Sequence, residues 1–363
     1  MTTIPNSLSG PISLAVDAMS GDLGVVSNID GSLTFAQQYS DVHLILVGDP
    51  SAIQSALDKQ SAYAGVKDQI SLHPATEIVD MQDSPASALR NKKDSSMRIA
   101  INLVKEGKAQ ACVSAGNTGA LMATARFVLK MVSGIDRPAI CTAIPATDGH
   151  HTHVMDLGAN VDCSSEHLYQ FALMGSELVK AIDSNPAPRV ALLNIGEEDI
   201  KGNDQVKQAS QLLQQDSHLN YIGYVEGNDI FTNKADVVVT DGFVGNVALK
   251  TMEGVARMIG KYMEEEFKRT PLNKLAGWLS MPVIKAFRQR IDPRAYNGAS
   301  LLGLQGIVIK SHGSADKMAF ANAMKIAVLE VQNNVVASIE DAMYKGVQRR
   351  DQEKDLQVDV QET

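Results

Sequence analysis

The feature that most restricts the fold of this 363-residue chain is a repeated order of short segments. A run rich in Val, Ile and Leu ends in a polar turn that contains Gly, and a helical pattern follows. This order is typical of βα units, in which the strands form a largely parallel sheet. The expected strands are Ile12–Met19, His43–Val47, Ala111–Ser114, Val154–Leu157, Val190–Ile195, Val237–Thr240 and Ile307–Lys310.

Apolar residues at three and four spacing predict helices that cover this sheet, for example Ser96–Lys105, Gly119–Met131 and Glu166–Ile182. With 44% hydrophobic and 21% charged residues, the chain has the composition of an ordinary globular protein with a sizeable core. We therefore expect one α/β domain over residues 1–349, followed by a polar tail over residues 350–363.

The polar turns also predict where a ligand binds. In open α/β sheets the ligand crevice lies outside the carboxyl ends of the strands, and the Gly, Asn, Asp and Ser turns follow those ends. We expect these turns to gather at one edge of the sheet.

Several common site types are excluded. No two glycines lie two positions apart, so G-x-G-x-x-G does not occur and a dehydrogenase is disfavoured. The P-loop, G-x-S-x-G and H-E-x-x-H motifs are also absent. The cysteines show no C-x-x-C spacing, which favours reduced thiols. Cys163 has no identifiable base, so we expect it to be inert rather than a nucleophile.

The formal net charge of -9 argues against a general nucleic-acid binder. No Lys or Arg precedes Lys59, so we expect no targeting leader and a cytoplasmic protein. No apolar stretch is long enough to predict a spanning helix.

The first candidate site is the turn Gly116, Asn117, Thr118 and Gly119 between a strand and a long helix. Backbone N–H groups at a helix N-terminus favour a phosphate oxygen. Simple capping of the helix by Asn117 or Thr118 is the alternative.

Two more candidates follow later strands. Lys201 and Asn203 lie in a turn, where Lys201 is either a point charge for an anion or a solvated surface lysine. Asp241 and Asn246 lie where a strand ends and a helix begins. Asn246 either donates to a carbonyl or oxyanion, or caps the helix.

Asp156 and Asn160 follow another strand and suit either phosphate work, a magnesium ion or ordinary Asx-turns. We favour the turns. His150, His151 and His153 resemble a metal cluster, but no further ligand stands at a fixed spacing, so we expect a solvated loop. The sequence therefore predicts neither a metal nor a cofactor.

A basic, amphipathic helical arm is expected at about residues 255–295. Between Arg257 and Arg294, nine basic residues stand against four acidic ones, and an apolar stripe surrounds Trp278. Such an element suits an anionic membrane surface or an acidic protein partner, or it packs in a dimer. The candidate contact residues are Lys274, Trp278, Lys285, Arg288 and Arg290.

The order of these segments resembles the acyl-ACP:phosphate acyltransferase (PlsX-type) family from about Ile12 to about Tyr344. The resemblance depends on the motifs Asp17–Asp22, Ser114–Ala120, Met155–Asp162, Asn194–Asn203, Val239–Asn246, Asp292–Ala299 and Lys310–Asp316. The family usually has a second Gly where this chain has Ser20. If that position needs a positive φ, Ser20 is strained.

The resemblance implies a three-layer, phosphotransacetylase- or isocitrate-dehydrogenase-like fold and a homodimer near the inner membrane face. It also implies an enzyme that forms acyl phosphate from long-chain acyl-ACP and inorganic phosphate, early in phospholipid biosynthesis. Lys201 and Asn246 would be the catalytic residues, and His312 would join the substrate-binding set. A short-chain enzyme acting on acyl-CoA and a non-catalytic scaffold for acyl carrier and membrane remain the alternatives.

Overall fold

The computed structural model describes residues 11–290 and 293–346. Its strands are β1 (Ile12–Asp17), β2 (Val42–Gly48), β3 (Ile70–Pro74), β4 (Ala111–Ser114), β5 (Ala139–Pro145), β6 (His151–Met155), β7 (Arg189–Leu193), β8 (Asn220–Val225), β9 (Val237–Val239), β10 (Ala299–Leu302) and β11 (Ile307–Lys310).

The α-helices are α1 (Gly24–Ala36), α2 (Pro50–Asp58), α3 (Pro85–Asn91), α4 (Ser96–Lys105), α5 (Thr118–Leu129), α6 (Ser165–Ile182), α7 (Asp204–Gln215), α8 (Gly242–Arg269), α9 (Pro271–Leu279), α10 (Met281–Arg290) and α11 (Lys317–Gln332). Residues 335–346 are also helical. Short 3₁₀ turns are η1 (Ser61–Gly65), η2 (Lys67–Gln69), η3 (Thr147–Gly149), η4 (Asp229–Phe231) and η5 (Pro293–Tyr296).

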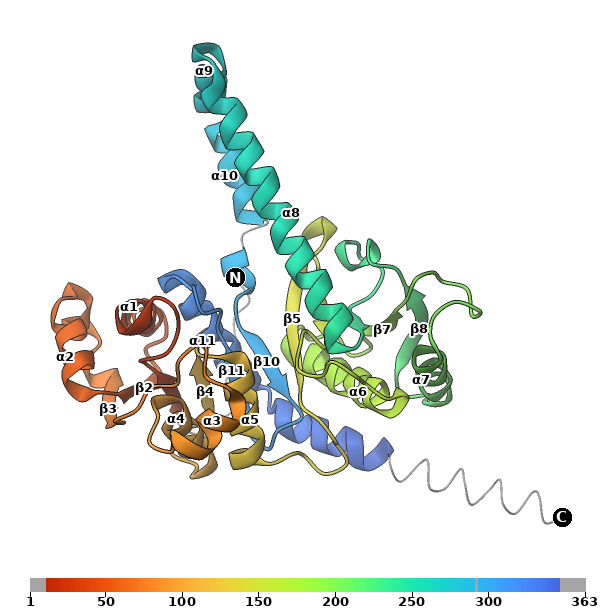
Figure 1. Ribbon diagram of the computed structural model, residues 1–363, viewed down its shortest axis with the longest axis horizontal. Coiled ribbons are helices and arrows are strands. Elements are labelled where there is room, and N and C mark those ends of the chain that lie inside the picture. The colour runs from red at the N-terminus through yellow and green to blue at the C-terminus, as the bar shows by residue number, and fades with distance from the viewer. Residues whose placement is uncertain (1–10, 291–292, 347–363) are drawn as a thin grey trace.

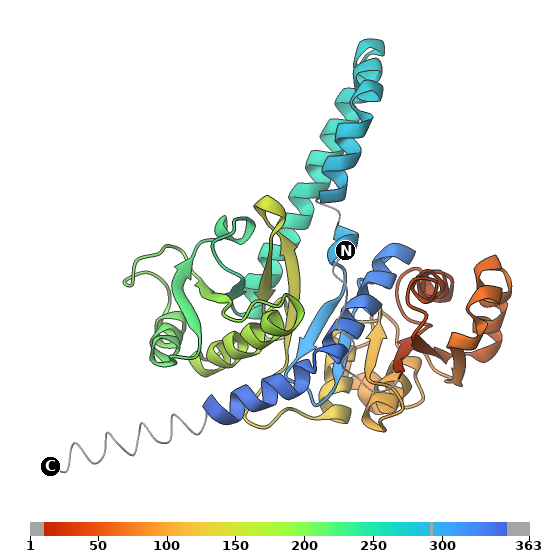
Figure 2. The same cartoon turned by 180° about the vertical axis from the view of Figure 1, so that it is seen from behind.

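All of these strands belong to one sheet with the order β3-β2-β1-β4-β11-β10-β5-β6-β9-β7-β8. Seven of its ten strand pairings are parallel, which confirms the predicted α/β class with a largely parallel sheet. Helices cover both faces of the sheet, giving the layered arrangement in Figures 1 and 2. The strands are rich in Val, Ile, Leu and Ala because a strand covered on both faces meets no water.

The expectation that the polar turns share one edge of the sheet is wrong. β10 is antiparallel to β11, β5 to β10, and β6 to β5, so strand direction reverses three times between the two halves of the sheet. The carboxyl ends of β1, β4 and β11 therefore lie at the edge opposite to those of β6, β9 and β7. Helix α8 begins after β9 and rises between the two halves (Figure 1).

Helix α8 extends beyond the sheet and its covering helices to form the arm (Figure 1). Helix α9 forms the tip of the arm, and α10 runs back along α8 toward the sheet. The tip is joined closely to α8, since Asn273 Nδ2 donates to the carbonyl of Glu266 at 2.9 Å. The arm consists of α8, α9 and α10, and its first helix starts at Gly242, earlier than the expected boundary near residue 255. The side chains of Arg288 and Arg290, and the whole predicted tail, lie outside the described residues.

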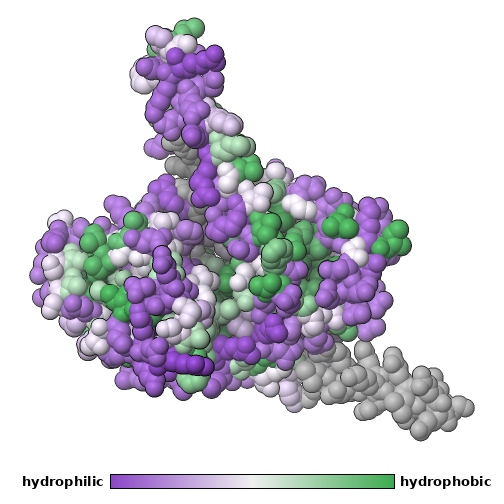
Figure 3. All heavy atoms as spheres, viewed as in Figure 1, coloured by the Kyte–Doolittle hydropathy of each residue, from purple (hydrophilic) through white to green (hydrophobic). Residues whose placement is uncertain are grey.

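The apolar stripe of the arm is on its surface. Leu272, Trp278 and Val283 are each at least 70% exposed. In the view of Figure 3 the shaft of the arm is mainly hydrophilic and hydrophobic atoms appear at its tip. Among the described residues, no helix combines the length and the apolar character that crossing a bilayer demands.

Candidate active site

The turn after β4 forms the N-terminus of α5. Asn117 is the N-cap, because its Oδ1 accepts from the N–H of Ala120 at 3.0 Å. Its Nδ2 donates to the carbonyls of Met81 and Asp83, at 2.6 and 3.1 Å. The capping alternative is thus present, and the Asn117 carboxamide ties the turn to the 81–83 loop. Anion binding there is left to the backbone N–H groups of Thr118 and Gly119, and it remains a prediction.

The turn after β1 lies beside this helix N-terminus. Gly21, not Ser20, has the positive φ (+103°), so the strain considered for Ser20 does not arise. The Ser20 hydroxyl is buried without a hydrogen-bond partner among the described residues. A Cβ on Gly116 would stand 3.1 Å from it. A hydroxyl without a hydrogen-bond partner among the described residues therefore lies next to the predicted anion-binding turn, Gly116–Gly119, which we call the anion seat.

The carboxyl end of β11 contributes two more basic groups. Lys310 is buried and its Nζ donates to the carbonyls of Ala115 and Ser311. Burial lowers the pKa of Lys310 to about 8, although the carboxylates of Asp22 and Asp17 oppose this. His312 is exposed, and its Nδ1 accepts from the backbone N–H of Ser314 at 3.2 Å.

In the second half of the sheet, Asp156 organises the turn after β6. One carboxylate oxygen accepts from the N–H groups of Ile140 and Ala159, and the other from the backbone and side-chain N–H groups of Asn160. Burial raises the pKa of Asp156, while these hydrogen bonds oppose the rise. Asn160 Nδ2 also donates to the carbonyl of Pro138 at 2.8 Å. Both side chains are thus occupied within the turn, as the Asx-turn interpretation requires.

Asn246 lies in the first turns of α8, directly against this loop. Asp241 caps the helix by accepting from the N–H of Val244 at 2.8 Å, so the capping alternative for Asn246 is wrong. Gly245 lets α8 approach closely, because a Cβ there would be 1.9 Å from the carbonyl oxygen of Asp156. The side chain of Asn246 is exposed, stands next to Gly158 and makes no hydrogen bond within the described part of the chain. Its carboxamide is therefore free to bind a ligand.

Lys201 lies in the turn after β7, the strand next to β9. Its ammonium pairs with Glu198 at 2.8 Å and lies over Gly196 of the same turn. This ion pair raises the pKa of Lys201. Asn203 caps α7 and, with Asp241, lines a hollow of about 380 Å³. No hydrogen bond or ion pair between described residues joins Lys201 to Asn246.

Sequence reasoning missed Lys250 of α8, whose charge influences groups in the other half of the sheet. It follows Asn246 by four positions, so both lie on one face of α8. After burial, the Lys250 and Lys310 ammonium groups are the largest influences that lower the pKa of His312, while Lys250 itself pairs with Glu253 on α8 at 3.1 Å. The i, i+4 spacing from Asn246 was the available signal. The face of α8 that carries Asn246 and Lys250 therefore acts electrostatically on the end of β11, while Lys201 pairs within its own turn.

Comparison with known proteins shows the family to which the chain belongs. Residues 12–338 match the family model described as "Fatty acid synthesis protein". The phosphate acyltransferase of Methylococcus capsulatus is 57% identical over 330 residues, which cover 91% of this chain and 96% of that protein. That of Alcanivorax borkumensis is 56% identical over 334 residues, 92% and 97% of the two chains. The chain belongs to the phosphate acyltransferase family.

Solved structures support the family fold at much lower identity. The EutD phosphotransacetylase from Staphylococcus aureus aligns with a TM-score of 0.56 and 16% identity, over 88% of this chain and 94% of that one. A phosphotransacetylase from Streptococcus pyogenes gives 0.56 and 17%, over 92% and 95%. These neighbours confirm the phosphotransacetylase-like architecture that the motif order implied.

The motifs on which the resemblance in the sequence depended include the segments that hold Asp156, Asn246 and His312. Cys163, in contrast, behaves as expected for an inert thiol. It is buried, and burial raises its pKa to about 12.

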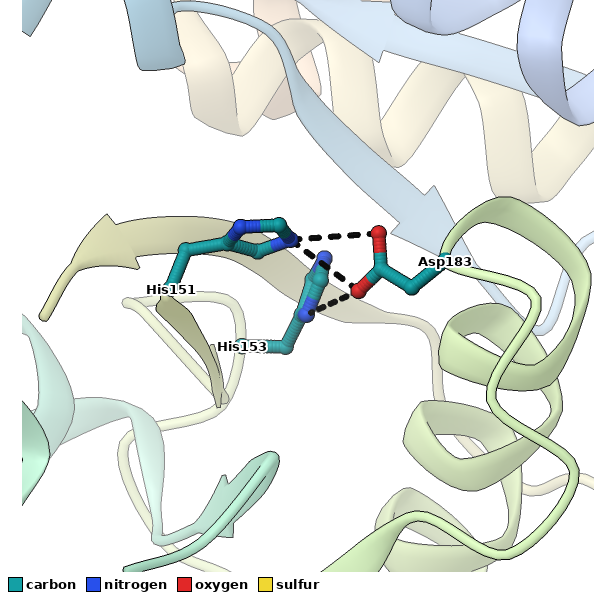
Figure 4. Close-up of side chains that lie close together, drawn as sticks. All are labelled: His151, His153 and Asp183. Atoms are coloured by element: carbon teal, nitrogen blue, oxygen red, sulfur yellow. Dashed lines mark hydrogen bonds and ion pairs between the residues drawn. The ribbon is translucent and has the colours of Figure 1, made fainter. Parts of the chain in front are cut away.

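The prediction of a solvated histidine loop is wrong for two of its three residues. β6 begins at His151, and His153 is only 3% exposed. Both rings lie against Asp183 from the end of α6 (Figure 4). The 30-residue separation hid this partner from sequence spacing.

Proposed function

We propose that the chain forms acyl phosphate from a long-chain acyl-ACP and inorganic phosphate, an early step of phospholipid biosynthesis. The relatives' activity as phosphate acyltransferases supports this reaction type. The observation that carries the site assignment is the exposed, unengaged carboxamide of Asn246 at the N-terminal end of α8. The positive end of the helix dipole stands behind it, which suits a developing oxyanion.

In the proposed reaction, a phosphate oxygen attacks the thioester carbonyl carbon. A C–O bond forms, the C–S bond breaks, and the carrier thiolate takes the proton that hydrogen phosphate gives up. Asn246 donates to the oxyanion of the intermediate. No acyl-enzyme is needed, because phosphate is itself the nucleophile and positioning lowers the barrier.

Phosphate is held by the N–H groups of Thr118 and Gly119. The ammonium of Lys201 starts from the opposite edge of the sheet, so its role as a second phosphate contact requires the turn after β7 to approach α5. The unpartnered Ser20 hydroxyl beside Gly116 supports an anion at this seat. Lys201 is 42% exposed and must exchange Glu198 for phosphate, which a flexible surface ion pair permits at little cost. Asp156, Asn160, Asn203 and Asp241 act by holding the turns. Lys250 adds positive charge on the α8 side, and His312, whose pKa is lowered, acts as a neutral hydrogen-bonding group.

The acyl chain has an apolar surface next to Asn246. Phe243, Val244 and Val247 on the same helix are 61%, 43% and 51% exposed. Such a surface favours a long acyl chain over an acetyl group, because its burial releases water from several apolar side chains at once.

Asn246→Ala is the decisive variant. Its turnover should fall by a factor of about 100 to 1,000, with the free energy of unfolding within about 0.5 kcal/mol of wild type because the side chain makes no contact that stabilises the fold. Acyl phosphate formation from long-chain acyl-ACP with labelled phosphate measures this. Asn228→Ala, an exposed asparagine elsewhere, is the control. Near-wild-type turnover of Asn246→Ala would end the assigned role.

The choice of carrier needs its own comparison. Phosphate-dependent thiol release should be faster from acyl-ACP than from acyl-CoA of the same chain length. The reverse preference favours the short-chain phosphotransacetylase alternative. Carrier binding without any acyl phosphate product favours the scaffold.

The basic arm is the proposed contact for acidic acyl-carrier protein and for the inner membrane face. Lys274 and Lys285 are exposed along with the apolar Trp278. Reversing both charges to Glu should raise the KM for acyl-ACP, weaken its salt dependence and leave kcat unchanged. Unchanged KM means that the arm is structural. Exposed Val255, Met258 and Ile259 on α8 support a homodimer packed along the arm, which sedimentation tests.

A further inference from the structure

Three potential metal ligands converge outside the proposed active site. His151 and His153 are alternate residues of β6 and therefore project from the same face of the strand. Asp183, the C-cap residue of α6, faces both rings (Figure 4). One nitrogen of each ring and one carboxylate oxygen all lie within 4.8 Å of one another.

One of these atoms lacks a partner. His153 Nδ1 is buried and makes no hydrogen bond to any described residue. It points at Asp183 Oδ2, but the distance of 3.6 Å is too long for a hydrogen bond. A buried polar atom without a partner is costly, and a bound ion or water is one way in which folded proteins satisfy such an atom.

One of the two ring–carboxylate distances suits a tetrahedral ion. At zinc bond lengths of about 2.0 to 2.2 Å, neighbouring ligand atoms of a tetrahedron stand roughly 3.3 to 3.6 Å apart. His153 Nδ1 is 3.6 Å from Asp183 Oδ2, whereas His151 Nε2 is hydrogen-bonded to the two carboxylate oxygens at 3.1 and 3.0 Å, a contact that an ion would have to open slightly. Two imidazoles with one carboxylate are a zinc-type donor set, whereas magnesium and calcium take oxygen ligands. The 35% exposed side chain of His151 leaves a side open for a water ligand.

The nearby charged groups do not compete for these ligands. Asp236 also acts electrostatically on both rings through its carboxylate, but it is paired with Arg189 at 2.8 Å. Its backbone carbonyl accepts from the N–H of His153 at 2.9 Å, which holds β6 in register at this point. His150 is exposed and lies outside the cluster.

We propose that His151, His153 and Asp183 bind one zinc-type divalent ion, which fastens the end of α6 to the start of β6. The site is structural rather than catalytic. His153 precedes Asp156 by three residues, roughly 10 Å along the strand, so the ion lies away from the Asp156–Asn160 turn beside Asn246. This inference does not depend on the proposed reaction.

The test uses tag-free, full-length protein that has been treated with a chelator and dialysed. Titration calorimetry with zinc alone should give one ion per chain, and zinc but not magnesium should raise the melting temperature. His151→Ala, at the exposed ligand, should weaken zinc binding by at least about 100-fold, since loss of a mere supporting contact costs 10- to 100-fold. His150→Ala is the matched control and should bind like wild type.

Cobalt gives a second readout that misfolding does not imitate. Wild type and His150→Ala should show the visible absorption of tetrahedral Co²⁺, and His151→Ala and Asp183→Asn should lose it while keeping the wild-type far-ultraviolet circular dichroism. The proposal is overturned if wild type binds no zinc, if magnesium raises the melting temperature equally, or if His151→Ala binds zinc with wild-type affinity.

Discussion

Replacing Glu330 with Gln should stabilise the chain above neutral pH. Glu330 of α11 is 2% exposed and accepts a hydrogen bond from Ser300 of β10, a strand that joins the two halves of the sheet. Burial raises its pKa from 4.5 to about 7. At pH values between 4.5 and about 7, Glu330 keeps its proton in the folded chain but has released it in the unfolded chain. Stability therefore falls as the pH rises through this interval and stays lower above it.

The size of this loss of stability follows from the difference between the two pKa values. At about 1.4 kcal/mol per pH unit, the ionised, buried carboxylate costs about 3 kcal/mol at high pH. Gln keeps the shape and the acceptor for Ser300 but does not ionise. From about pH 5 to about pH 8, the free energy of unfolding of Glu330→Gln should rise by about 2 to 3 kcal/mol relative to wild type.

Urea unfolding at several pH values, followed by far-ultraviolet circular dichroism, measures this difference. Fluorescence is unsuitable because the single tryptophan, Trp278, lies 70% exposed on the arm and does not report on the core. Glu340→Gln, at an exposed glutamate, is the control and should show no such pH dependence. A difference between Glu330→Gln and wild type that stays constant with pH would refute the reasoning.

Two further predictions concern the turns of the site. Gly245→Ala should destabilise the fold by about 1 to 3 kcal/mol and impair turnover, because its Cβ would overlap the Asp156 carbonyl and push α8 away. In contrast, Gly254→Ala on the same helix meets no atom within 4 Å and should stabilise by about 0.5 to 1 kcal/mol; equal melting temperatures for the two would contradict the packing argument. Asn117→Ala should cost about 1 to 2 kcal/mol in urea unfolding through the lost N-cap, and a change below about 0.3 kcal/mol would show that the 81–83 loop does not depend on it.

Much of the fold could be predicted from local pattern. Buried parallel strands need continuous apolar runs, and β1, β2, β4, β6, β7, β9 and β11 all fall within a few residues of the predicted runs. The strands β3, β5, β8 and β10 were missed. Two of these, β5 and β10, form the antiparallel centre of the sheet, so the reversal of direction was missed with them.

The site was predictable where chemistry is local. Turn residues, helix caps and the family motifs are contiguous in sequence, so the Gly116–Gly119 and Asp156–Asn160 turns and the helix start near Asn246 were all found. Their spatial relation was not. Which of Asp241 and Asn246 caps α8 depends on where the helix starts, within one turn of backbone. The direction in which the Lys201 side chain points depends on its ion pair with Glu198.

The sequence by itself determined the strand–turn–helix order, the family and the residues able to do the chemistry, because apolar periodicity and short motifs act over a few residues. Only the tertiary structure decided that two sets of turns face opposite edges, that the charge of Lys250 on α8 acts on His312, and that Asp183 meets His151 and His153. These contacts join residues 30 or more positions apart, and they form only when strand pairing and helix packing have fixed the path of the whole chain.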